Sequence, residues 1–277
     1  MRTCIYFMLL LVFSSMANSY PYPDHKPILV IGGSLGNGVT PFNDGLTSPL
    51  LGASVGQGSY LSVGDALIRS PLYNGYVINQ AEAGGTTFAR PSCRYAFYGN
   101  ACGEGMFNSY STQLQRAIAR VSSLSDGVIN ADFVVITPPN DCLHSDAQGV
   151  PELQAVYCTE ADWEALADRL IAVGQEALAI GLKPVYLTYP EESGVDLELF
   201  ASSSGLIWAI SSADYIRMRE TVHSRIAHDL PAALISNGWG DFHHIGDGIH
   251  PDVRSSRLAA RQILVDIGYI PFGGAQW

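Results

Sequence analysis

The chain has 277 residues, of which 47% are hydrophobic and 15% are charged, so it can bury a sizeable core and is not a disordered or low-complexity protein. Its 15 Lys and Arg residues against 26 Asp and Glu residues give a net charge of −11. A surface of that sign repels nucleic acid and anionic lipid headgroups, which argues against a nucleic-acid-binding or polybasic membrane-binding protein.

The first nineteen residues have the pattern of a secretory signal peptide. Met1–Thr3 is short and basic, Cys4–Phe13 is a run of ten apolar residues, and Ala17–Ser19 places small residues where a signal peptidase cleaves. Ten apolar residues span about half of a bilayer, so a membrane anchor is the weaker alternative. We expect cleavage after residue 19, a mature domain over residues 20–277, a secreted or periplasmic protein, and no integral membrane span.

Five short apolar segments are predicted strands of one sheet. Each is a continuous apolar run without alternation, which is typical of parallel strands that helices cover on both faces. In chain order, the segments are residues 27–32, 76–79, 133–137, 184–188 and 232–236.

Helical patterns separate these segments. Thr159–Asp162 is a candidate capping box, and Gly181 is a candidate end of the helix that the box begins. Apolar residues at helical spacing predict further helices over residues 112–121, 215–226 and 253–267. The alternation predicts one α/β domain, a three-layer α/β/α sandwich around a central, mainly parallel five-stranded sheet.

Polar, glycine-rich segments follow the predicted strands, at the ends where a parallel sheet places its binding site. They contain Ser34, Asp247 and His250. A serine hydroxyl becomes a nucleophile when a histidine takes its proton and a carboxylate orients that histidine. The backbone N–H groups of Ser34 and Gly84 and the side-chain amide of Asn140 could bind the oxyanion that such a reaction forms. The sequence therefore predicts acyl-transfer chemistry.

Four of these segments, in this order, resemble the sequence blocks of the SGNH or GDSL-type hydrolases. The blocks correspond to Gly32–Leu35, Asn79–Gly85, Asn140–Asp141 and Asp247–His250, and Tyr110–Leu114 resembles the helix start that often follows the second block. The resemblance spans most of the mature chain. It implies the flavodoxin-like SGNH hydrolase fold and an esterase or lipase that forms an acyl-enzyme.

The same resemblance implies the role of each site residue. Ser34 is the expected nucleophile, His250 the base and then the acid, and Asp247 the carboxylate that orients it. Ser34, Gly84 and Asn140 are the expected oxyanion hole. No metal or organic cofactor is implied.

Two residues depart from the family pattern. Gly33 stands where the family motif Gly-Asp-Ser-Leu has its Asp, and Pro138 stands where Gly-x-Asn-Asp has its Gly. A proline fixes φ and lacks an N–H, so we expect the loop before Asn140 to have a different shape, with help from a disulfide at Cys142.

Four cysteines remain after removal of the signal peptide, and an even number in an exported protein favours disulfides. We expect the two local pairings because short loops close easily. A zinc site lacks the usual ligand spacing, and buried free thiols stay an alternative. The expected pairs are Cys93 with Cys102 and Cys142 with Cys158.

Two segments rich in apolar residues are candidate walls of the substrate cleft. Residues 88–107 follow the glycine block directly, and residues 192–210 could form an opposing lid. Their apolar side chains favour a lipid-like or short-chain acyl ester, although aromatic walls bind glycans equally well. We expect a monomer that acts on a small-molecule, lipid or glycan ester, without a nucleic-acid partner.

Other interpretations of the same residues stay open. An acyltransferase or a carbohydrate acetylesterase would use the same acyl-enzyme, and a binding protein with an impaired site would explain Gly33 and Pro138. Gly32–Gly36 also matches the nucleophile elbow of α/β-hydrolases, but in that fold several strands precede the elbow. A nicotinamide-dependent dehydrogenase would need a Tyr-x-x-x-Lys pair, which the chain lacks.

The remaining histidines suggest no separate site. Asp241, His243 and His244, with the nearby Asp247 and His250, could indicate a metal site, but ligands must converge and a turn-rich segment does not ensure that. We expect His243 and His244 to be loop histidines with ordinary partners. A second pair on a predicted helix is expected at the surface, namely His223 and His228.

Overall fold

The structure is a computed structural model that describes residues 25–38, 60–92, 105–143, 148, 156–204 and 207–271. The predicted signal peptide and the predicted Cys93–Cys102 pair lie outside these residues.

Five parallel strands form the central sheet in the order β2-β1-β5-β6-β7. Leu29 of β1 lies opposite Ile78 of β2 on one side and Val134 of β5 on the other. Every pairing in this sheet is parallel, so the prediction of a mainly parallel five-stranded sheet is confirmed. The strands are β1 (Ile28–Ile31), β2 (Val77–Asn79), β5 (Phe133–Ile136), β6 (Lys183–Leu187) and β7 (Leu234–Ser236).

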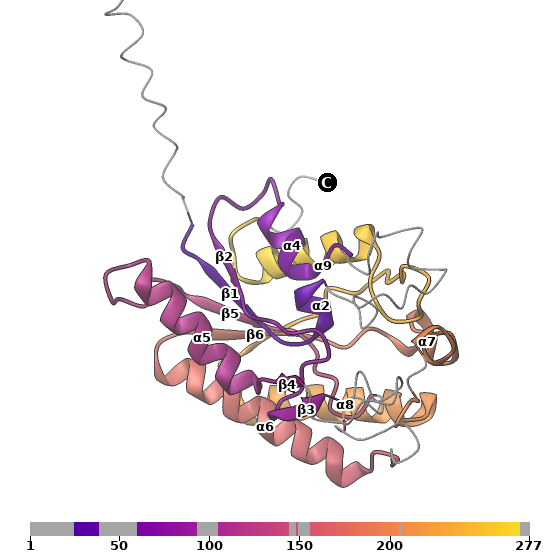
Figure 1. Cartoon of the computed structure of the whole chain (residues 1–277). Helices are drawn as coiled ribbons and strands as arrows, with labels where there is room; N and C mark the ends of the chain where they lie inside the picture. Colours follow the sequence, from indigo (N-terminus) through magenta and orange to yellow (C-terminus); the bar gives the residue numbers. More distant parts are fainter. Residues whose placement is uncertain are drawn as a thin grey trace, which may run out of the picture.

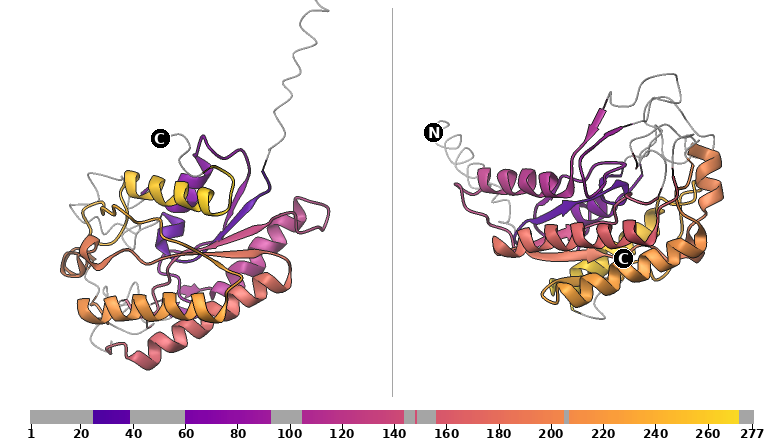
Figure 2. Two further views of the ribbon diagram at one scale, coloured as in Figure 1. Left: turned by 180° about the vertical axis from the view of Figure 1, so that it is seen from behind. Right: turned by 90° about the horizontal axis from the view of Figure 1, so that it is seen from below.

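Helices cover both faces of this sheet, as Figures 1 and 2 show. On one face lie α4 (Val63–Ile68) and α9 (Val253–Asp266), and on the other lie α5 (Tyr110–Ser123), α6 (Glu160–Ala179) and α8 (Ser212–Asp229).

Side chains along each strand alternate between the two helical layers, because successive Cβ atoms of a strand point to opposite faces. In β1, Ile28 and Val30 join the apolar cluster under α4 and α9, whereas Leu29 and Ile31 join the cluster under α5, α6 and α8. The three-layer arrangement is therefore confirmed, with two cores separated by the sheet.

Local signals explain where the long helices begin and end. The Thr159 N–H donates to the Asp162 side chain over 2.7 Å, which is one half of the expected capping box. After α6, Gly181 has a φ of +84°, a left-handed conformation that suits glycine and ends the helix. The Asp252 side chain accepts the Ser255 N–H over 2.7 Å at the start of α9.

Several short elements have no counterpart among the predicted ones. They are the helix α4 named above, α2 (Ser34–Asn37), η4 (Glu192–Gly194), α7 (Leu197–Ser204) and the antiparallel pair β3 (Arg90–Ser92) and β4 (Gly105–Phe107).

Among the described residues, no helix is both long and apolar enough to cross a bilayer.

Candidate active site

The candidate site lies at the point where the order of the strands reverses. The chain passes from β1 to β2 on one side and then to β5 on the other, so β1 and β5 are neighbours whose connections leave in opposite directions. In open α/β sheets, the crevice beyond the carboxyl ends of two such strands is the usual binding site. Ser34 begins α2 just beyond β1, and Asn140 follows β5.

A glycine is needed in the turn that leads from β1 to Ser34. Gly32 has a φ of +137°, and a Cβ there would lie 2.0 Å from the Thr137 Oγ1 atom after β5. The Gly32 N–H donates to the Gln113 side chain of α5 over 2.7 Å. The two neighbouring strand ends can therefore approach closely only because residue 32 has no side chain.

Ser34, His250 and Asp247 form one continuous hydrogen-bonded chain. The His250 Nε2 atom lies 3.0 Å from the Ser34 Oγ atom, and the His250 Nδ1 atom is hydrogen-bonded to the Asp247 carboxylate. The carboxylate can only accept, so Nδ1 carries a proton and Nε2 is left to accept one from the serine. This is the arrangement in which a histidine can activate a serine hydroxyl.

Asp247 is buried and its carboxylate is fully engaged. It also accepts the backbone N–H of His250 over 2.9 Å and that of Ile249 over 3.1 Å. Burial by itself would raise the pKa of Asp247, but the charge of His250 and these hydrogen bonds outweigh it and hold the pKa below its ordinary value. Asp247 is therefore a carboxylate that orients the imidazole.

Two aromatic rings contact His250. The Tyr60 ring lies with its centroid 4.8 Å from that of His250, and the Phe200 ring lies 6.1 Å away, edge-on. The Tyr60 hydroxyl donates to the Ser34 carbonyl. Burial, and next the charge of Asp247, raise the pKa of Tyr60, so the hydroxyl keeps its proton for that bond. Tyr60 thus contacts both the serine turn and the histidine.

Three potential donors for an oxyanion come from three different loops. Ser34 is the first residue of α2, and among the described residues its N–H has no acceptor. The Asn140 side-chain amide donates one hydrogen to the Gly85 carbonyl over 3.1 Å, which leaves its second hydrogen available. Gly84 has a φ of +76°, and its carbonyl accepts from Arg90 over 2.6 Å, which fixes the orientation of this segment.

The first departure from the family pattern, Gly33, has a spatial explanation. A Cβ at residue 33 would lie 2.8 Å from the Asn140 Nδ2 atom and 3.0 Å from the Pro138 carbonyl oxygen. Its φ is −92°, so the constraint is space and not backbone conformation. The serine turn and the Pro138 loop therefore pack so closely that a side chain at position 33 would displace the Asn140 amide.

The second departure, the proline pair before Asn140, is held by tyrosine hydroxyls. Tyr110 donates to the Thr137 carbonyl over 3.2 Å, and Tyr189 donates to the Pro139 carbonyl over 2.9 Å. Because two prolines supply no N–H, hydroxyls from the surrounding elements provide the contacts that fix this loop.

A disulfide and a buried carboxylate hold the other end of that loop. Cys142 is bonded to Cys158, with their Cα atoms 5.5 Å apart, which agrees with the expected pairing. The Asp141 carboxylate accepts the Thr87 N–H over 2.8 Å and pairs with Arg169 of α6 over 3.0 Å. Burial raises the pKa of Asp141, although these partners oppose the shift.

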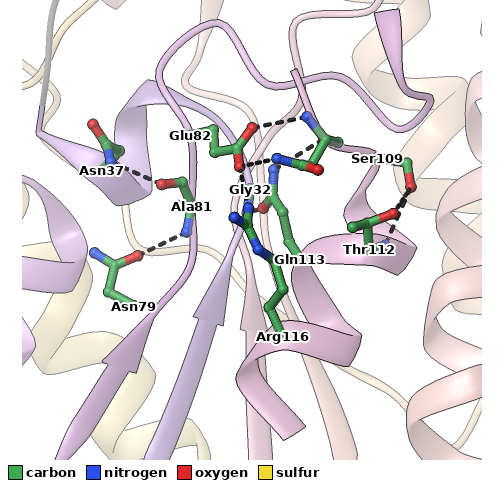
Figure 3. A network of polar contacts seen from close by, with 10 residues as sticks. Gly32, Asn37, Asn79, Ala81, Glu82, Ser109, Thr112, Gln113 and Arg116 are labelled. Atoms are coloured by element: carbon green, nitrogen blue, oxygen red, sulfur yellow. Dashed lines mark hydrogen bonds and ion pairs between the residues drawn. The ribbon is translucent and has the colours of Figure 1, made fainter. Parts of the chain in front are cut away.

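The glycine block is held by a network of polar side chains, which Figure 3 shows. Glu82 accepts from the backbone N–H of Asn108 over 2.8 Å and from its side chain over 2.6 Å, and it pairs with Arg116 over 2.9 Å. Glu82 therefore anchors this segment to α5 and to the residue that precedes its N-terminal cap.

Two asparagines join the glycine block to α2. The Asn37 side chain donates to the Ala81 carbonyl over 2.8 Å (Figure 3). The Asn79 side chain donates to the Gly36 carbonyl over 2.7 Å. These bonds fix the position of the block that carries Gly84 relative to the helix that begins at Ser34.

A small cavity of about 30 Å³ opens beside the serine. Its wall includes residues from the 192–210 segment, so that segment does face the site. The described lining residues are Ser34, Leu35, Pro138, Asn140, Leu143, Tyr189, Pro190, Val195, Leu197, Trp208, Tyr215 and Ile249. Of the other candidate wall, residues 93–104 lie outside the described chain, and Phe88 packs under the Arg169 guanidinium at 5.1 Å.

The other histidines have local partners, and one expectation about them was wrong. His243 contacts Asp241 over 3.1 Å, and the His244 Nδ1 atom accepts the N–H groups of Gly246 and Gly248. His223, which we expected at the surface, is only partly exposed. It packs against the end of β6, where its Nε2 atom accepts the Tyr189 N–H over 3.2 Å.

Three residues that position the site were not singled out from the sequence. Tyr60 and Arg90 act on backbone carbonyls, a role that leaves no motif. Gln113 lies within the Tyr110–Leu114 segment that resembles the family, so a signal for it existed, but the segment gave no indication that its amide would bond Gly32.

Comparisons with known proteins agree on the fold. No protein-family model and no curated protein matches the sequence. The chain is similar to Est24, a carbohydrate acetylesterase from Sinorhizobium meliloti, at 15% identity and a TM-score of 0.55, covering 87% of this chain and 98% of that one. A catalytic mutant of Axe2, an acetylxylan esterase from Geobacillus stearothermophilus, aligns at 14% identity over 90% and 98% of the two chains, with a TM-score of 0.48. The likeness to Est24 supports the predicted α/β fold, whose strand order is the flavodoxin-like one.

Proposed function

We propose that this chain is a serine ester hydrolase of the SGNH type, which cleaves carboxylic esters through an acyl-enzyme. The observation that carries the proposal is the 3.0 Å contact between the His250 Nε2 atom and the Ser34 Oγ atom, made by residues 216 positions apart. With Asp247 on the other ring nitrogen, it forms the arrangement that acyl transfer by serine requires.

In the first half of the reaction, the Ser34 Oγ atom attacks the ester carbonyl carbon while the His250 Nε2 atom takes the hydroxyl proton. The tetrahedral intermediate then collapses, and His250 returns that proton to the oxygen of the leaving alcohol. In the second half, water attacks the acyl-enzyme and gives a proton to His250. Ser34 recovers this proton as the carboxylic acid leaves.

Negative charge on the carbonyl oxygen is stabilised by the backbone N–H groups of Ser34 and Gly84 and the free hydrogen of the Asn140 amide. Each donor of this kind contributes about 3 kcal/mol to lowering the barrier. The polar network around the glycine block and the tyrosine contacts to the proline loop support this role, because they hold the donors in place before substrate binds.

The test is covalent labelling with a fluorophosphonate probe, combined with hydrolysis of p-nitrophenyl acetate. The mature protein should be labelled at Ser34 and should hydrolyse the ester, and Ser34→Ala should lose both properties. A Tyr76→Phe variant is a matched control, since this side chain is 61% exposed. A folded wild-type protein that is neither labelled nor active would mean that the fold serves as a binding protein.

The proposal includes export of the protein by its N-terminal segment. The support is the basic start, the ten-residue apolar run and the small residues that precede position 20, together with a disulfide between Cys142 and Cys158. N-terminal sequencing of the protein recovered outside the cytoplasm should begin at residue 20. Recovery with Met1 intact would argue against cleavage.

A further inference from the structure

Among the side chains of the described residues that line the cavity beside Ser34, only two offer polar groups for a substrate. These are the Ser34 hydroxyl and the Asn140 amide, which the proposed reaction uses on the ester carbonyl. Two tyrosines also line the cavity, but Tyr189 donates its hydroxyl to the Pro139 carbonyl and Tyr215 donates its hydroxyl to the Pro190 carbonyl. The remaining space therefore suits a hydrocarbon group, since an unpaired polar group there would lose its hydrogen bonds to water.

The volume of the cavity limits how long that hydrocarbon group can be. The cavity measures about 30 Å³, and one water needs roughly 10–15 Å³ on such a measure. It therefore has room for two or three non-hydrogen atoms. An acetyl group has one carbon beyond its carbonyl and a butyryl group has three, whereas an octanoyl group has seven.

The wall formed by Val195, Leu197 and Trp208 is fixed in place. The Trp208 indole N–H donates to the Leu197 carbonyl, and the Trp208 ring lies 5.2 Å from the Phe200 ring, which contacts His250. The Asp196 N–H donates to the Gly248 carbonyl over 2.7 Å.

Gly248 stands between Asp247 and His250, so the wall and the catalytic loop are joined directly. A Cβ at Gly248 would lie 2.1 Å from the Asp196 carbonyl oxygen, which shows how closely the two segments pack. Movement of the wall away from the cavity would disturb the loop that carries the histidine. These contacts join the described part of the 192–210 segment to the loop that carries the histidine.

We propose that the preferred substrates are esters of short acyl groups, of about two to four carbons, and that the Trp208 ring sets this limit. The inference rests on the proposed function and narrows it, because it places the acyl group in the cavity beside Ser34.

The experiment measures kcat/KM for the p-nitrophenyl esters of two, four and eight carbons. Wild type should hydrolyse the acetate and butyrate at least about tenfold better than the octanoate, because surplus methylenes find no space. Trp208→Ala should raise the octanoate-to-acetate ratio about tenfold. Ile207→Ala is the matched control, because this neighbouring side chain is 40% exposed and does not line the cavity, and its ratio should stay within twofold of wild type.

Different results would overturn different statements. If Ser34 is labelled by fluorophosphonate but wild type hydrolyses the octanoate as fast as the acetate, the limit on acyl length is wrong and the proposed function stands. Equal octanoate-to-acetate ratios in Trp208→Ala and Ile207→Ala would show that Trp208 does not set the limit on acyl length. If Ser34 is neither labelled nor active on any ester, the proposed function itself fails. Should Trp208→Ala not fold, Leu197→Ala widens the same wall and must give the same change in ratio.

Discussion

The two loops that carry Gly84 and Asn140 are held in place by different means. The glycine block, Asn79–Gly85, is fixed by hydrogen bonds and an ion pair of partly exposed side chains, with Arg116 54% exposed. The asparagine loop, residues 138–143, is fixed by buried tyrosine hydroxyls, a disulfide and the buried Asp141.

This difference follows from the proline pair. The two prolines that begin the loop have carbonyl groups but no N–H groups, so the first half of the loop is fixed by donors from other elements, and the first N–H of the loop is that of Asn140, which donates to the Gly85 carbonyl over 3.1 Å. Tyr110 of α5 and Tyr189 after β6 supply the donors for the first half from inside the protein. The glycine block has its own N–H groups and needs fewer buried partners. Variants that disturb the asparagine loop should therefore lose more activity and stability than variants that disturb the glycine block.

The largest expected effect comes from the point where the serine turn meets the asparagine loop. In Gly33→Ala, the new Cβ would lie 2.8 Å from the Asn140 Nδ2 atom, and this side-chain amide would have to move. Displacing one oxyanion donor costs about 10²- to 10³-fold in kcat. The measurement is kcat/KM for p-nitrophenyl acetate.

Stability provides the control for this variant. An amide at the end of a side chain can shift without unfolding the protein, so the thermal midpoint of Gly33→Ala should stay close to that of wild type. The variant Gly33→Asp, which has the residue of the family motif, should lose activity for the same reason. Activity within threefold of wild type in both variants would show that position 33 does not govern the Asn140 amide.

The next effect concerns the disulfide of the asparagine loop. In the double variant Cys142→Ser, Cys158→Ser, the unfolded chain is no longer constrained over a separation of 16 residues. Such a loop corresponds to about 3 kcal/mol of unfolding free energy. Denaturant unfolding should reveal this loss, and kcat/KM should fall several-fold because Asn140 lies two residues away. An unchanged free energy of unfolding would mean that the tyrosines alone hold the loop.

A third effect reaches the same loop through His223. Burial, and next the charge of Arg219, lower the pKa of His223 from 6.5 to about 4. Between these values the unfolded chain binds a proton that the folded chain does not, so stability falls as the pH drops through this window, by up to about 3 kcal/mol. His223→Gln can still accept the Tyr189 N–H but does not titrate. Unfolding midpoints from pH 7 to pH 4 should decline less steeply in the variant than in wild type.

The sequence predicted the long elements of the fold well. The five strands and the helices α5, α6, α8 and α9 have continuous or periodic apolar patterns, and their ends were placed within a few residues. The short elements around the site were missed, because α2 has four residues and α4 has six, which is too little for a period to be seen.

The chemical groups of the site were also evident from the sequence, whereas their supports were not. Ser34, Asp247 and His250 follow strands and carry a recognisable pattern, and the structure brings them within hydrogen-bond distance. Tyr60 and Arg90 donate to backbone carbonyls, which any residue has, so no spacing in the sequence indicates their role. The expectation that His223 is exposed was wrong because a helical position shows which face a residue occupies but not what packs on it.

The smallest expected effect tests the glycine block and so completes the comparison of the two loops. Glu82→Gln removes the charge that pairs with Arg116 but keeps an oxygen for the Asn108 N–H. An exposed ion pair contributes about 1 kcal/mol or less, and salt screens it. The variant should therefore lose under about 1 kcal/mol of stability and less than threefold in kcat/KM. At high salt, the free energies of unfolding of wild type and variant should differ even less. A loss as large as that of the double cysteine variant would mean that the glycine block, like the asparagine loop, depends on partners that cannot be replaced.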